Sequence, residues 1–357
     1  MKRIYLDYAS LTPVDRRVFA IIKKYSDPNF SNPSALYQSA VNAKLAFDEA
    51  RSRIAEIIHA HSDEILFTSG GTESNQLVLN AFQGRKIIIS SIEHSSIFFN
   101  SIDNPNIIKV KVDQNGLLDI EDLKSKLTPD IALVSIMMVN NEMGAVEPII
   151  EITKIIRDFN KKFNSNILFH TDASQAVIHN ELFVEKLGVD LMTIDGNKIY
   201  GPRSTGLLYI RRNKIKIDRP GTLNIPGIMG ISYALEIADK NRTKETKRII
   251  DLRDYFINEL RNINKEIKIN GNLNLISPHI LNISIPNIDN EFFVLQLDAK
   301  GIECSTKSAC LRDEDDSYVL KAIDANSKNS IRFSFGRMTS RGELKTVLKA
   351  IKNILNK

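Results

Sequence analysis

Lys198 and Asp172 are residue types suited to imine chemistry, and each lies at or just past the end of an apolar run. Lys198 lies just past residues 189–194, a short run rich in β-branched side chains that predicts a buried strand. Asp172 ends a second run of this kind and is followed by small residues and Gln175. Because open α/β sheets bind ligands at the carboxyl ends of their strands, we expect these side chains to meet there.

A lysine beside a carboxylate is the pair that pyridoxal phosphate (PLP) requires. Burial lowers the pKa of a lysine amine, which favours a Schiff base with the cofactor aldehyde, and the acid keeps the pyridine nitrogen protonated. Other interpretations are open at this point. Lys198 is also explained as a solvated loop lysine among 48 Lys and Arg residues, and Asp172 as a helix N-cap.

A phosphate site is predicted where residues 64–76 run from a short strand into Ser69-Gly70-Gly71-Thr72-Glu73. A helix is expected over residues 75–82. Small residues at this turn let backbone N–H groups approach a phosphate, and the helix dipole favours the anion. A plain capped helix explains the same pattern.

Two further loops follow predicted strands. His94 comes after the strand expected at residues 86–91, and it is either a group that stacks on a planar cofactor and moves protons or an ordinary surface histidine. Asn141 follows the strand expected at residues 131–139.

The carboxyl-terminal third adds a thiol and two guanidinium groups. Cys310 lies in a polar segment near Lys307 and Arg312, a setting that makes a thiol reactive, although an inert surface cysteine fits as well. Arg332 lies near the start of the strand expected at residues 331–335, and Arg337 lies just beyond its end. Arginine can bind a carboxylate with two hydrogen bonds. Strand alternation directs the two arginines to different sides, so at most one faces a given site.

Composition sets outer limits on the class of protein. The chain has 357 residues, 43% of them hydrophobic and 25% charged, with a net charge of +5 spread along the sequence. These values are typical of a globular protein of two domains and argue against nucleic acid as a partner. Two cysteines exclude a disulfide framework and a four-ligand zinc site, and no metal site is expected. No signal segment or long apolar run is seen, so we expect a soluble cytoplasmic protein without a membrane partner.

The elements that position these residues alternate between strand and helix. Seven strands in a mostly parallel sheet are expected, with helices on both faces. This α/β unit occupies residues 13–230. A long charged helix over residues 231–264 leads into a smaller α+β domain, which comprises residues 1–12 and 231–357.

Ten short motifs then point to one family. In chain order they are YLDYASLTPVD (5–15), NPS (32–34), FTSGGTESN (67–75), EH (93–94), VNNEMG (139–144), HTDASQ (170–175), NKIYGP (197–202), SAC (308–310), SYVL (317–320) and IRFSFGRMT (331–339). In order and spacing, this set resembles the cysteine desulfurases, class V enzymes with the fold-type I PLP fold. The resemblance runs nearly end to end.

The resemblance implies a role for each cofactor residue. Lys198 carries the cofactor as a Schiff base, Asp172 pairs with the pyridine nitrogen, and Gln175 hydrogen-bonds the phenolic oxygen. His94 stacks on the ring and moves protons. Gly71 and Thr72 hold the phosphate, and Asn141 contacts cofactor and substrate. In the homodimer typical of the family, Thr222 reaches the phosphate of the neighbouring subunit.

The resemblance also implies a reaction. Arg337 binds the carboxylate of L-cysteine, and Cys310 takes its sulfur as a persulfide and releases L-alanine. The segment between SAC and SYVL is nearly as long as in scaffold-serving desulfurases. An acceptor protein for iron–sulfur cluster assembly or tRNA thiolation is therefore expected.

Three departures from the family pattern concern cofactor binding. Asp195 and Asn197 stand where the family has serine and histidine, and a carboxylate aimed at the phosphate repels it. The glycine-rich segment that precedes Arg219-Pro220-Gly221-Thr222 in the family is missing. Tyr37 and Lys307 replace a histidine and a small residue.

Other functions compete with desulfuration. A selenocysteine lyase or an aminotransferase has the same fold, although Cys310 argues against the aminotransferase. Asp195 and the missing segment favour a third alternative, a degenerate paralogue that binds PLP weakly or not at all and acts as a partner-binding subunit.

Overall fold

The computed structural model describes residues 3–26, 31–307 and 316–356, and at its centre is a seven-stranded sheet. The strands are β2 (Ile65–Thr68), β3 (Lys86–Ser90), β4 (Ile107–Val110), β5 (Ile131–Ser135), β6 (Leu168–Asp172), β7 (Leu191–Asp195) and β8 (Gly206–Ile210). Their order is β2-β8-β7-β6-β5-β3-β4, and β8 runs antiparallel to both neighbours while the remaining pairs are parallel. The predicted α/β fold with a mostly parallel sheet of seven strands is confirmed.

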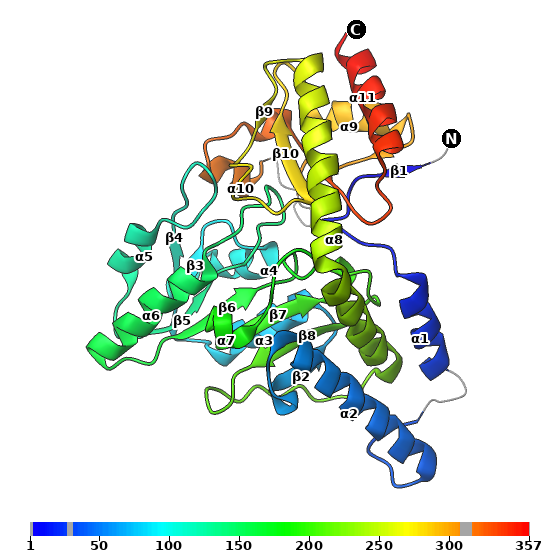
Figure 1. Cartoon of the computed structure of the whole chain (residues 1–357). Coiled ribbons are helices and arrows are strands. Elements are labelled where there is room, and N and C mark those ends of the chain that lie inside the picture. Colours follow the sequence, from blue (N-terminus) through cyan, green and yellow to red (C-terminus); the bar gives the residue numbers. More distant parts are fainter. Residues whose placement is uncertain (1–2, 27–30, 308–315, 357) are drawn as a thin grey trace.

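Strand alternation divides the apolar side chains between two helical layers. In β3, Ile88 belongs to one hydrophobic core, whereas Ile87 and Ile89 belong to another on the opposite face. Helices α2 (Gln38–Ile58), α6 (Ile149–Phe163) and the first half of α8 (Ile225–Ile263) cover the first face, and α3 (Gly71–Ala81) covers the second (Figure 1). Both faces are therefore buried, which explains the continuous apolar runs of the strands.

Shorter elements complete this layer. They are α1 (Arg16–Ser26), α4 (Ser95–Phe98), α5 (Ile120–Lys126) and α7 (Val184–Leu187). α1 and α2 both pack on α8. Among the described helices, none combines the length and the apolar character needed to cross a membrane.

The second part of the molecule is built on a small antiparallel sheet. It contains β9 (Lys268–Ile269), β10 (Ile280–Ser284) and β12 (Ser330–Ser334), and β1 (Ile4–Tyr5) pairs separately with β11 (Ile302–Glu303). Helices α9 (Asn290–Asp298), α10 (Tyr318–Ala322) and α11 (Arg341–Leu355) complete it. Strand β1 is thus joined to the carboxyl-terminal part of the chain.

Helix α8 connects the two parts (Figure 1). Its 39 residues contribute to the first core as far as Ala238 and to a separate core from Ile249 onward. The predicted helix at residues 231–264 is therefore real but begins earlier, at Ile225. The domain boundaries at residues 12/13 and 230/231 stay a prediction.

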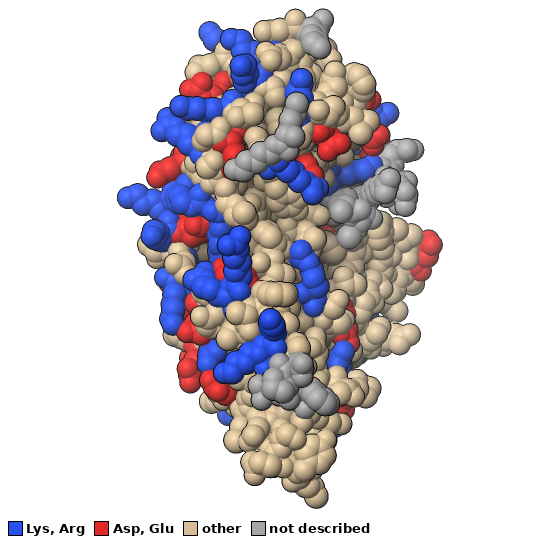
Figure 2. Space-filling model, turned by 90° about the vertical axis from the view of Figure 1, so that its right-hand side faces the viewer, with Lys and Arg blue, Asp and Glu red and all other residues tan. Residues whose placement is uncertain are grey.

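The surface carries charges of both signs. Figure 2 shows lysine and arginine side chains interspersed with acidic ones over the face that includes α1 and α11. This mixture agrees with the charge pattern of the sequence.

Candidate active site

Lys198 lies at the end of a single 3-10 turn, Gly196–Lys198, which follows β7 directly. Its Nζ atom donates hydrogen bonds to the carbonyl oxygens of Ala9, at 3.0 Å, and Ser10, at 2.5 Å. The lysine is half-buried and faces the amino-terminal segment. This contact argues against a solvated loop lysine.

Gln175 reaches the same carbonyl oxygen as Lys198. Its Nε2 atom donates to the Ala9 oxygen at 2.8 Å, and its Oε1 atom lies 3.2 Å from Nε2 of His279. Because Oε1 can only accept, His279 carries its proton on Nε2, and its Nδ1 atom accepts from Ser277 Oγ. Burial lowers the pKa of His279 well below its usual value, so the ring is neutral and fixes the orientation of the amide.

Asp172 is buried at the end of β6, beside β7 in the sheet. Its Oδ2 atom accepts from Asn75 Nδ2 at 2.8 Å, and its Oδ1 atom accepts from the backbone of Ser174 at 2.9 Å. One oxygen therefore caps a turn. The alternative interpretation expected a helix N-cap, but residues 174–179 form turns rather than a helix. The other oxygen is held by α3.

Hydrogen bonds continue from Asp172 to His94. Asn75 Nδ2 also contacts Ser96 Oγ at 2.9 Å, and Ser96 Oγ lies 2.9 Å from His94 Nδ1. His94 is the N-cap of α4. The structure therefore links the predicted proton-moving histidine with the predicted partner of the pyridine nitrogen.

The first turn of α3 contains the glycines predicted to hold a phosphate. The helix begins at Gly71 rather than near residue 75, and Gly70 has a φ of 144° and no side-chain cap. A β-carbon at position 71 would lie 3.2 Å from Ser174 Oγ. Ser174 Oγ is buried and has no hydrogen-bond partner within the described chain, so a hydroxyl donor is available beside a glycine backbone. These features fit a phosphate, and Thr72 is exposed on the same turn.

Asp195 lies at the same place. Its Oδ2 atom is 3.4 Å from the position of that β-carbon at residue 71, and its Oδ1 atom accepts from the backbone of Asn197 at 2.8 Å. The carboxylate therefore points where the sequence comparison suggested that it would oppose a phosphate.

Glu73 connects this turn to the segment after β8. It accepts from the backbone of Ser69 and from Arg219 Nε, the latter at 3.0 Å. Burial opposes ionisation, but these hydrogen bonds prevail and lower the pKa of Glu73. Thr222 is exposed three residues beyond Arg219.

The two arginines have different surroundings. Arg337 forms an ion pair with Asp15 at 3.0 Å and lies over the ring of Tyr200, 4.2 Å from its centre. Arg332 is fully buried and donates to the carbonyl oxygen of Asn141 at 2.8 Å. Only Arg337 was assigned to the substrate carboxylate from the sequence, and the contact with Asn141 makes Arg332 a second candidate.

Cys310 lies outside the described residues, but the chain on both sides of its segment is anchored near the site. Ser305 pairs with the backbone of Arg332. Ser317 Oγ donates to Glu142 at 2.6 Å, and Tyr318 donates to the carbonyl oxygen of Glu93 at 2.5 Å. The other cysteine, Cys304, is free, and burial raises the pKa of its thiol, which makes it unreactive.

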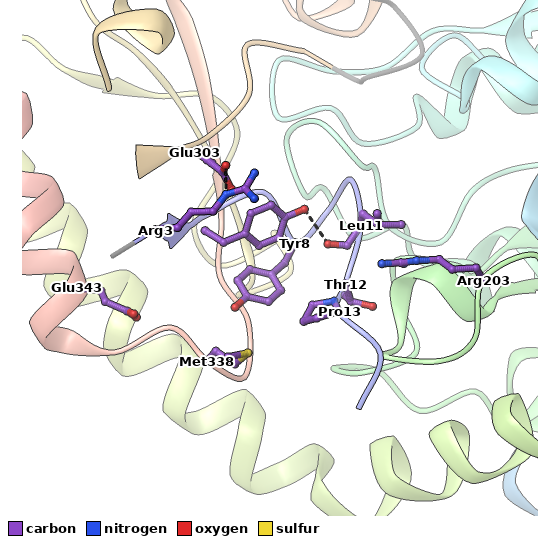
Figure 3. A pocket seen from close by; sticks show the side chains of 10 residues that line it. Arg3, Tyr8, Leu11, Thr12, Pro13, Arg203, Glu303, Met338 and Glu343 are labelled. Atoms are coloured by element: carbon purple, nitrogen blue, oxygen red, sulfur yellow. Dashed lines mark hydrogen bonds and ion pairs between the residues drawn. The ribbon is translucent and has the colours of Figure 1, made fainter. Parts of the chain in front are cut away.

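A cavity of about 460 Å³ lies beside the same amino-terminal segment. Figure 3 shows Leu11, Thr12 and Tyr8 on its walls together with the Arg3–Glu303 ion pair. None of the predicted cofactor residues lines it. The candidate active site is therefore the cluster around Lys198 and not this cavity.

Known proteins are similar to this chain over its whole length. Residues 4–220 and 218–347 match the family described as aminotransferase class-V. The protein named cysteine desulfurase IscS from Dictyoglomus turgidum is 38% identical over 100% of this chain and 96% of its own length, and its namesake from Methanosarcina thermophila is 34% identical over 100% and 93%. The X-ray structure of a NifS-like protein from Rickettsia africae has a TM-score of 0.89 and 29% identity, with both chains covered completely.

Insertions and deletions separate these chains. The alignment with the Dictyoglomus protein extends over 383 positions, more than the 357 residues of this chain. That relative therefore contains residues that have no counterpart here.

Proposed function

This chain belongs to the class-V aminotransferase family, and we propose that it is a PLP-dependent cysteine desulfurase. Lys198 and Gln175 converge on the carbonyl oxygen of Ala9, with Asp172 on the neighbouring strand, and this convergence is the observation that carries the proposal. The amine, the amide and the carboxylate match the aldehyde, the phenolic oxygen and the pyridine nitrogen of PLP. When bound, PLP accepts the electrons released at the α-carbon of an amino acid.

The residues of the chain prepare the site for that chemistry. The neutral His279 and the Ala9 carbonyl hold the amide of Gln175, which leaves its second N–H for the cofactor. Asp172 remains buried beside Asn75 and Ser174, where it can hold a proton on the pyridine nitrogen. His94 is positioned through Ser96 to move a proton at the substrate.

Cys310 supplies the thiolate for sulfur transfer in this proposal. The carbon–sulfur bond of L-cysteine breaks, a sulfur–sulfur bond forms on Cys310, and L-alanine leaves. Arg337 or Arg332 binds the substrate carboxylate, and Asn141 contacts the substrate. The persulfide then passes to an acceptor protein for iron–sulfur cluster assembly or tRNA thiolation.

A homodimer is part of the proposal. Tyr37, Val41 and Leu45 recur every fourth residue along α2 and are exposed, and Leu36 beside them is 97% exposed. A stripe of this kind favours contact with a second copy of the chain. Thr222 would then reach the phosphate bound by the neighbouring subunit. From the composition, we also propose a cytoplasmic location and no nucleic acid partner.

Absorption spectra test the proposal directly. With PLP, the protein is expected to show a band at roughly 390–420 nm that changes when L-cysteine is added, and Lys198→Ala should lack it. Cys310→Ser should keep the band but lose persulfide formation. No band at saturating PLP would exclude the desulfurase in favour of the degenerate paralogue, and transamination that persists in Cys310→Ser would favour the aminotransferase.

A further inference from the structure

The side chain of Asp195 lies beside the glycines at the first turn of α3, where a ligand could approach the helix. Its Cβ and Oδ2 atoms lie 3.3 and 3.4 Å from where a β-carbon of residue 71 would be, and its Oδ1 atom lies 3.8 Å from the corresponding point at Gly70. Oδ1 also accepts the backbone hydrogen bond of Asn197, 2.8 Å away. The carboxylate is therefore held toward the glycines by the same turn that positions Lys198.

An anion at this position satisfies the helix end. The first N–H groups of α3 have no partners within the helix, and the helix dipole places partial positive charge there. Gly70 provides no side-chain cap. Asp195 thus places a protein carboxylate where a phosphate group is expected to bind.

Two basic groups of this region contact other partners. Arg219 is paired with Glu73 at 3.0 Å, and Lys198 donates to the carbonyl oxygens of Ala9 and Ser10. Asp172 adds a further acid at the end of the adjacent strand. An incoming phosphate gains the Ser174 hydroxyl and the helix N–H groups but meets the charge of Asp195 at close range.

We propose that Asp195 determines the cofactor specificity of this site. Its carboxylate weakens the contribution of the phosphate to binding, so that contacts with the ring supply most of the affinity. The proposal rests on the proposed function, since it concerns the cofactor of that same site. It predicts that this chain discriminates only weakly between PLP and pyridoxal, the same ring without a phosphate.

Two ligands and two proteins isolate the effect. Dissociation constants for PLP and pyridoxal would be measured by absorption titration with the wild type and Asp195→Asn, at about pH 8, where a phosphate monoester is a dianion. Asparagine keeps the size of the side chain and an oxygen that can accept from Asn197. We expect Asp195→Asn to bind PLP about 10- to 100-fold more tightly, the scale of one charge removed at close range, and pyridoxal within about 2-fold of the wild type.

Control variants distinguish the effect of the Asp195 charge from an effect of altered structure. Asp130→Asn removes an exposed carboxylate just before β5, at the amino-terminal end of that strand and so at the far end of the sheet from the site. This variant should change neither the affinity for PLP nor that for pyridoxal by more than about 2-fold. Asp195→Ser provides a second variant if Asp195→Asn does not fold. Equal tightening for both ligands, or no tightening for PLP, would overturn the proposal.

A probe without a ring distinguishes this proposal from the proposed function. If neither protein binds PLP or pyridoxal, the desulfurase function fails, and the shift in melting temperature with inorganic phosphate is then measured. A larger shift in Asp195→Asn than in the wild type would still support the repulsion. Equal shifts would reject it.

Discussion

The two ends of the candidate site differ in how completely they are built. At the ring end, Lys198, Gln175 and Asp172 each have protein partners, and β6, β7 and the amino-terminal segment hold them in place. At the phosphate end, Ser174 Oγ has no partner among the described residues, Asp195 faces the glycines and Thr222 is exposed.

This difference follows from the elements that form each end. Adjacent strands fix the ring groups to one another, because their separation is set by the hydrogen bonds of the sheet. The phosphate end depends on turns and on the segment between β8 and α8, where one substitution changes the local charge without disturbing the sheet. The chemistry at the ring end is therefore robust, whereas cofactor affinity can change during evolution.

The largest effect is expected from Asp172→Asn at the ring end. A neutral amide cannot stabilise the protonated pyridine nitrogen, so kcat for alanine formation should fall by about 10² to 10³-fold. The assay would measure alanine from L-cysteine at saturating PLP, with the melting temperature as a control for folding. A loss smaller than about 3-fold would show that the ring end does not depend on this acid.

Glu147 shows what full burial does to a carboxyl group. Burial raises the pKa of Glu147 to about 8, opposed by hydrogen bonds from the backbone of Leu118. Because the folded pKa exceeds the unfolded value, the stabilising contribution is complete below about pH 4.5 and is lost as the pH rises through about 8.

Glu147→Gln should therefore be more stable than the wild type at pH 8, by on the order of 3 kcal/mol, because the amide needs no proton and can still accept from Leu118. The advantage should disappear near pH 4. Chemical denaturation at both pH values measures it. A difference that does not change with pH would contradict the raised pKa.

A smaller loss is expected when the amide of Gln175 is released. His279→Ala removes the group that holds Oε1, and kcat should fall by about 10-fold because the amide no longer points at the cofactor. The absorption maximum of bound PLP should shift in the same variant. His279→Asn can donate to Oε1 and should recover part of the rate, whereas a purely structural role would leave the spectrum unchanged.

The smallest effect is expected at the phosphate end, from Thr222→Ala. Loss of one hydroxyl donor should weaken PLP binding by about 3- to 10-fold, and pyridoxal binding should not change. Titration at a protein concentration that keeps the dimer intact measures this. An unchanged affinity for PLP would show that Thr222 does not reach a phosphate in the dimer.

Much of the fold could be predicted from local pattern. The apolar runs before Asp172 and Lys198 marked β6 and β7, because strands buried on both faces carry continuous apolar sequence. Element ends were less accurate: α3 begins at Gly71, because the small and polar residues 71–74 carry no apolar periodicity that would predict a helix there. His279 was missed because its neighbours in sequence give no sign that it contacts Gln175, more than one hundred residues away.

By itself, the sequence determined which chemical groups are present and that Asp172 and Lys198 stand at or just past the ends of buried strands, because strand periodicity and turn residues are local properties. Only the tertiary structure decided where the groups point. It showed that Ala9 and Ser10 hold the lysine, that Arg332 contacts Asn141 and that the carboxylate of Asp195 faces the first turn of α3. Each of these contacts joins segments distant in sequence, and such contacts follow from the packing of the whole chain rather than from any local pattern.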